Sequence, residues 1–147
     1  MRTLAVIFAL FITGFTSNAQ QTAKDTTGTI SVEILNVTSD NGKMVYGIYT
    51  QESFMKKPVF SKNAKIENGK SVVTFTDVPK GEYAVICFHD KNDNDKMDFE
   101  TNGMPQEDYG VSNNKLNPFG PPVWNDGKFT FDGHEKVITI RLEQLTI

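Results

Sequence analysis

Hydrophobic and polar residues alternate along most of the chain with the period of two that is typical of half-buried β-strands. Five segments show this alternation, and their apolar positions are Ile30, Val32 and Ile34; Met44, Tyr46 and Ile48; Val73 and Phe75; Phe129 and Phe131; and Ile138, Ile140 and Leu142. Residues 83–88 instead form a nearly continuous apolar run, which is typical of a central strand covered on both faces. The pattern predicts about seven strands.

Turn signals separate these segments. Asn41-Gly42 and Asn68-Gly69 tolerate the positive φ of tight hairpin turns, and residues 79–81 supply a Pro-Lys-Gly turn before the central strand. Only residues 52–57 could form a short helical turn. We therefore predict an all-β fold, an antiparallel two-sheet sandwich of the prealbumin-like or Ig-like kind, as a single domain over residues 28–147 with one long loop.

The first residues indicate export. A basic Arg2, an apolar run over residues 4–15 and a small-x-small site at residues 17–19 predict a cleaved signal peptide over residues 1–19. Residues 20–27 then form a polar, flexible leader. A membrane anchor is the alternative, but a spanning helix needs about 20 apolar residues. The signal peptide predicts a location in the periplasm or outside the cell. Cys87 is the single cysteine, so no intramolecular disulfide forms even though such a location would permit one.

Acidic residues are concentrated in one segment. The chain from Gln20 onward has 14 basic and 18 acidic side chains, a net charge of −4, which argues against nucleic-acid partners. Residues 90–108 alone contribute a net charge of −5. They belong to a stretch from Asp90 to Gly127 without any strand pattern, and loops of that length are uncommon unless they have a function.

The first part of this stretch has the spacing of an EF-hand calcium loop. Its predicted ligands are the side chains of Asp90, Asn92, Asn94 and Asp98 and the backbone carbonyl of Lys96. Asp95 stands where a glycine is usual, and Thr101 stands where a bidentate glutamate is usual, so Glu100 or Glu107 would have to supply that carboxylate. A solvated acidic turn is the alternative, and zinc or copper is disfavoured because His89 is the only nitrogen or sulfur ligand nearby.

The second part of the stretch is rich in aromatic residues. We predict that Tyr109, Asn113, Phe119 and Trp124 contact a ligand, either cell-envelope polysaccharide or a protein. The alternative is that these aromatics pack a small core of the loop itself. Cys87 and His89 share a strand face but are about 7 Å apart along the strand, too far for a nucleophile and base pair.

Several motifs together resemble a known family, the domain of unknown function 2141 of exported bacterial proteins. They are Phe88-His89-Asp90, the acidic D-x-N-x-N run, the segments 103–107 and 109–114, and Phe119-Gly120-Pro121-Pro122. The resemblance covers residues 28–142 and implies export and this fold, but no activity. The turn at residues 78–83 also resembles prealbumin-like and carboxypeptidase-regulatory-like sandwiches, and the acidic run is similar to calcium loops of adhesin B-type repeats.

These observations predict an exported, non-enzymatic β-sandwich whose calcium-ordered loop forms a binding or interaction surface, without a membrane span after signal cleavage. The first alternative is a hydrolase acting on envelope material, with Asp98, Glu107 or His89 as acid or base. The second alternative is a purely structural module of the cell envelope.

Overall fold

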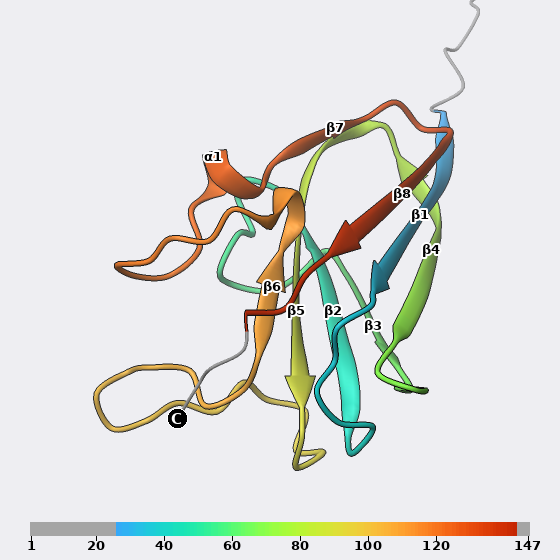
Figure 1. The fold of residues 1–147 in the computed structure, drawn as a ribbon. Coiled ribbons are helices and arrows are strands. Elements are labelled where there is room, and N and C mark those ends of the chain that lie inside the picture. The colour runs from blue at the N-terminus through green and yellow to red at the C-terminus, as the bar shows by residue number, and fades with distance from the viewer. Residues whose placement is uncertain (1–25, 144–147) are drawn as a thin grey trace, which may run out of the picture.

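The computed structural model describes residues 26–143, which form eight strands and two short helical segments (Figure 1). The strands are β1 (Thr27–Ile34), β2 (Lys43–Tyr49), β3 (Phe60–Ala64), β4 (Ser71–Pro79), β5 (Gly81–Asp90), β6 (Tyr109–Val111), β7 (Phe129–Phe131) and β8 (Glu135–Ile140). The helical segments are the 3-10 turn η1 (Ser112–Asn114) and α1 (Trp124–Gly127). Residues 52–57 form a turn and no helix. The predicted signal peptide lies outside the described residues.

The strands form two sheets, as predicted. One has the order β4-β1-β8, and the other has the order β3-β2-β5-β6, with β7 pairing with the start of β5. All strand pairs are antiparallel except β1 and β8, which run parallel. The two-sheet all-β prediction is therefore confirmed, and the parallel pair is a feature that alternation within single strands does not reveal.

The core lies between the sheets and includes most of the residues that the alternation singled out. Ile30, Val32 and Ile34 of β1 are fully buried, as are Met44, Tyr46 and Ile48 of β2. The central strand β5 pairs with β2, β6 and β7, in agreement with its continuous apolar run. Cys87 on this strand is buried, and burial raises the pKa of its thiol, so it packs as a small apolar side chain.

The long stretch from Asp90 to Gly127 is not one loop, which corrects the prediction. Tyr109–Val111 forms β6 on the free edge of β5, and η1 and α1 follow it. Three residues are too few to show a period of two, so β6 could not be predicted from the hydrophobic pattern. The stretch is thereby divided into residues 91–108, called the acidic loop below, and residues 115–123.

Both ends of the domain join the sheets. Thr27 already belongs to β1, so this strand begins within the segment predicted as a leader. At the other end, the amide of Glu143 donates to the carbonyl of Tyr109 (2.8 Å), which connects the chain after β8 to β6. Over residues 26–143, no helix is long and apolar enough to cross a membrane.

Candidate functional site: the acidic loop

The acidic loop begins where β5 ends, next to the Asn41-Gly42 turn. Gly42 has φ +73°, and a Cβ at this position would lie 2.0 Å from the carbonyl oxygen of Asp90, so only glycine allows the close approach. His89 is fully buried, and its Nε2–H donates to the carbonyl of Asn41 (2.7 Å). His89 therefore holds the turn against β5, and its burial keeps it from touching a substrate.

Asp90 organises the first turn of the acidic loop. Its carboxylate is fully buried and accepts hydrogen bonds from the backbone amides of Asn94 (3.0 Å) and Asp95 (2.8 Å). Asp95 has φ +63°, so it adopts the left-handed conformation that the usual glycine provides in calcium loops. Aspartate tolerates this conformation better than most residues do, and the missing glycine therefore does not prevent the turn.

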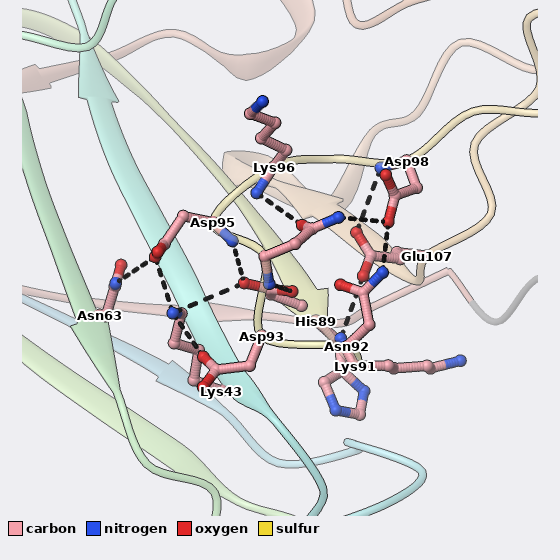
Figure 2. Close-up of polar contacts among 12 residues, drawn as sticks. Lys43, Asn63, His89, Lys91, Asn92, Asp93, Asp95, Lys96, Asp98 and Glu107 are labelled. Carbon is pink, nitrogen blue, oxygen red and sulfur yellow. Dashed lines mark hydrogen bonds and ion pairs between the residues drawn. The ribbon is translucent and has the colours of Figure 1, made fainter.

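Asn92 and Asn94 both direct their side chains at Asp98, and Figure 2 shows Asn92 and Asp98 on the same side of the loop as Glu107. Oδ2 of Asp98 accepts hydrogen bonds from Nδ2 of Asn92 (2.7 Å) and from Nδ2 of Asn94 (2.9 Å). Oδ1 of Asn94 in turn accepts from the amide of Lys96 (2.9 Å), while the Lys96 side chain extends away from this cluster. Two of the predicted ligand side chains, Asn92 and Asn94, thus contact a third, Asp98.

Glu107 joins this cluster from the other end of the loop. Only 3% exposed, it accepts the amide of Lys91 on Oε1 (3.0 Å) and the amide of Asp98 on Oε2 (3.3 Å). Burial raises the pKa of Glu107, the two amides partly offset that effect, and the charges of Asp90 and Asp98 add to it.

Glu100 has a different position. Its backbone closes a small turn with Met104 and Gly103, and its exposed side chain has no hydrogen bond or ion pair within the described chain. Of the two glutamates considered for the missing carboxylate, the geometry favours Glu107 over Glu100.

Lys43 on β2 is a residue of the site that the sequence did not suggest. Its ammonium lies 2.5 Å from Asp93, 2.7 Å from Asp95 and 3.7 Å from Asp90 (Figure 2). Hydrogen bonds to Asp93 and Asp95 raise the pKa of Lys43, and the same contact lowers the pKa of Asp95. Asp93 and Asp95 therefore pair with a cation of the protein itself.

The side chains of Asn92, Asn94 and Asp98 can offer amide and carboxylate oxygens, which are the hard ligands that calcium prefers. Within residues 26–143, no three His, Cys, Asp or Glu side chains are grouped as around a metal ion, so carboxylates alone do not make a site. The amides of Asn92 and Asn94 would have to contribute. Each now directs its nitrogen at Asp98, and a 180° rotation of the amide group would direct its oxygen there instead.

Two of the predicted ligand-contact residues, Tyr109 and Asn113, make contacts within the chain itself. Asn113 closes the chain on itself, because its Nδ2 donates to the carbonyls of Asp126 (3.0 Å) and Lys128 (2.9 Å). Tyr109 is a half-buried strand residue paired with Phe88. These contacts give both residues a packing or clamping role.

Trp124 and Phe119 differ in their surroundings. The half-buried Trp124 ring packs edge-on against Phe54 at 5.5 Å, and Phe54 contacts Tyr49 in the same way at 6.0 Å. Phe54 comes from the 50–57 turn, and no local pattern predicts this contact between distant segments. Phe119, by contrast, is 97% exposed.

Comparison with known proteins places the chain in a family. No curated protein matches it. A similar solved structure is the pilus-presented adhesin Spy0125 (Cpa), with 11% identity and a TM-score of 0.30 over 82% of this chain. The chain spans 27% of that adhesin, and a likeness this low carries no argument about function. The family model described as "Uncharacterized protein conserved in bacteria (DUF2141)" matches residues 32–139. This match covers most of the sandwich, and the chain therefore belongs to the DUF2141 family.

Proposed function

We propose that the protein is an exported, non-enzymatic interaction module of the cell envelope whose acidic loop binds calcium. The observation that carries the calcium proposal is the meeting of Asn92 and Asn94 with one oxygen of Asp98. Asp90 and Glu107 support it, because they order the loop backbone from both ends before any ion binds. An ion bound there would be held by Asn92, Asn94 and Asp98 and by the carbonyl of Lys96.

A non-catalytic role is supported by the burial of two of the three acid or base candidates, Glu107 and His89. Glu107 is buried and engaged with two backbone amides, and His89 is enclosed in the core. A general acid or base must reach a substrate proton within hydrogen-bond distance. Export is proposed from the sequence of residues 1–19.

Calorimetry of the chain from Gln20 onward tests the calcium proposal. An ion that binds only the folded state stabilises it by RT ln(1 + [L]/Kd), about 2.7 kcal/mol at a hundredfold excess over Kd. We expect millimolar calcium to raise the Tm relative to a chelator. Asp98→Ala should abolish this shift, because Asp98 is the centre of the cluster.

Asp93→Ala is the matched control, since it removes one acid of the same loop that faces Lys43 instead of Asp98. It should retain the calcium shift even if its Tm in chelator changes. An unchanged Tm of the unmodified protein in calcium would contradict the proposal and leave a solvated turn. An equal loss of the shift in both variants would indicate diffuse charge attraction without defined ligands.

A further inference from the structure

The chain contains three Asn-Gly pairs, at residues 41–42, 68–69 and 102–103. In such a pair the backbone nitrogen of the glycine can lose its proton and attack Cγ of the asparagine, because glycine has no side chain that blocks the approach. The new N–Cγ bond closes a succinimide ring, and the side-chain nitrogen leaves with a proton as ammonia. Water then opens the ring at either carbonyl and leaves aspartate or isoaspartate. The reaction therefore requires a glycine amide and an asparagine side chain that are free to meet.

In the Asn68-Gly69 pair the glycine amide is occupied. It donates to Oδ1 of Asp40 (2.8 Å), and the amide of Asn68 donates to Oδ2 of the same carboxylate (2.9 Å). The pair also forms the turn of a hairpin in which Glu67 and Lys70 exchange two backbone hydrogen bonds (2.8 and 3.1 Å). An attack on Cγ of Asn68 would have to break the bond to Asp40 and distort this turn.

The Asn102-Gly103 pair is held in a similar way. The amide of Gly103 donates to the carbonyl of Glu100 (2.9 Å). The side chain of Asn102 is engaged as well, because its Oδ1 accepts the amide of Met104 (3.0 Å). Both reacting groups of this pair are therefore tied to other partners.

The Asn41-Gly42 pair differs from both. Its two residues are exposed, and within residues 26–143 neither the side chain of Asn41 nor the amide of Gly42 has a hydrogen-bond partner. The backbone carbonyl of Asn41 accepts the Nε2–H of His89 (2.7 Å). When the Gly42 nitrogen loses its proton, part of the negative charge moves to this oxygen, because the peptide group is conjugated. A donor at the oxygen stabilises that charge and so favours the nucleophilic form of the nitrogen.

We propose that Asn41 is a modification site of the protein, at which spontaneous deamidation through Gly42 produces aspartate or isoaspartate. Isoaspartate adds one carbon to the backbone and a carboxylate to the turn. Gly42 lies so close to the carbonyl of Asp90 that no Cβ fits between them, and His89 holds the carbonyl of Asn41. The extra carbon must displace one of these contacts, so the modification loosens the junction between this turn and the acidic loop. The reaction needs no ion, and the proposal is therefore independent of calcium binding.

Peptide mapping by mass spectrometry tests the assignment. The chain from Gln20 onward is incubated in a chelator at mildly alkaline pH, folded and in urea, and the conversion of amide to acid is followed at each pair. In urea the three asparagines should react at comparable rates, because each precedes a glycine. Folding should slow Asn68 and Asn102 by at least about tenfold, the factor that corresponds to about 1.4 kcal/mol of hydrogen bonding to be broken, and should slow Asn41 much less.

Conversion of Asn68 or Asn102 as fast as Asn41 in the folded protein would overturn the proposal, as would the absence of conversion at Asn41. Asn41→Ser is the matched control, because serine lacks the reacting amide and keeps the backbone carbonyl that accepts His89. Its initial Tm should equal that of the unmodified protein. After the same incubation its Tm should be retained, whereas the converted fraction of the unmodified protein should unfold at a lower Tm. An unchanged Tm of converted protein would refute the loosening of the junction.

Discussion

Replacing Asp90 by asparagine tests whether one buried carboxylate organises the acidic loop. The carboxylate accepts two backbone amides, from Asn94 and Asp95, and asparagine keeps the shape but turns one of the two acceptor oxygens into a donor. Hydrogen bonds to charged groups contribute about 1.5 to 3 kcal/mol each. One bond is lost and the other weakened, so we expect a loss of about 3 kcal/mol in the free energy of unfolding.

Thermal and urea unfolding in a chelator measure this loss, which corresponds to a decrease of about 10 °C in Tm for a domain of this size. Asp93→Asn is the control, since it removes the same charge from the same loop and keeps a residue that tolerates the positive φ at this position. Asp93 is exposed and paired only with Lys43, so its replacement should cost no more than about 1 kcal/mol. If the two variants lost the same stability, Asp90 would not organise the loop, and the reasoning from its hydrogen bonds would be refuted.

Two further predictions concern neighbouring parts of the structure. Asn113→Ala should destabilise the protein by about 2 to 3 kcal/mol, because it removes two hydrogen bonds and places alanine at φ +69°. Asn113→Gly should cost only the hydrogen bonds, since glycine adopts this φ without strain. An unchanged Tm in both variants would contradict the clamping role. Burial raises the pKa of Glu107, so the folded state binds a proton more readily than the unfolded state does. In the absence of calcium, the free energy of unfolding should therefore decrease as the pH rises from the ordinary carboxyl pKa through the raised pKa of Glu107. Urea unfolding of Glu107→Gln across this pH range should lack that decrease, and an identical pH profile would show that Glu107 does not contribute it.

The sequence by itself determined the parts of the molecule that depend on local patterns. The alternation in β1 and β2 identified residues that are fully buried, because a strand at the face of a sandwich exposes every second side chain. The spacing of the acidic run likewise singled out Asn92 and Asn94, which both contact Asp98, because the turn that brings these side chains together is made within the segment.

Only the tertiary structure decided the contacts between distant segments. The parallel pairing of β1 with β8, the placement of Lys43 against Asp93 and Asp95, and the packing of Phe54 on Trp124 each join residues far apart in the chain. The choice of Glu107 over Glu100 has the same origin, since it depends on how the chain folds back after Asp98. Local periodicity reports whether a side chain is buried, but the partner of that side chain is set by the packing of the two sheets and by the course of the loops between them.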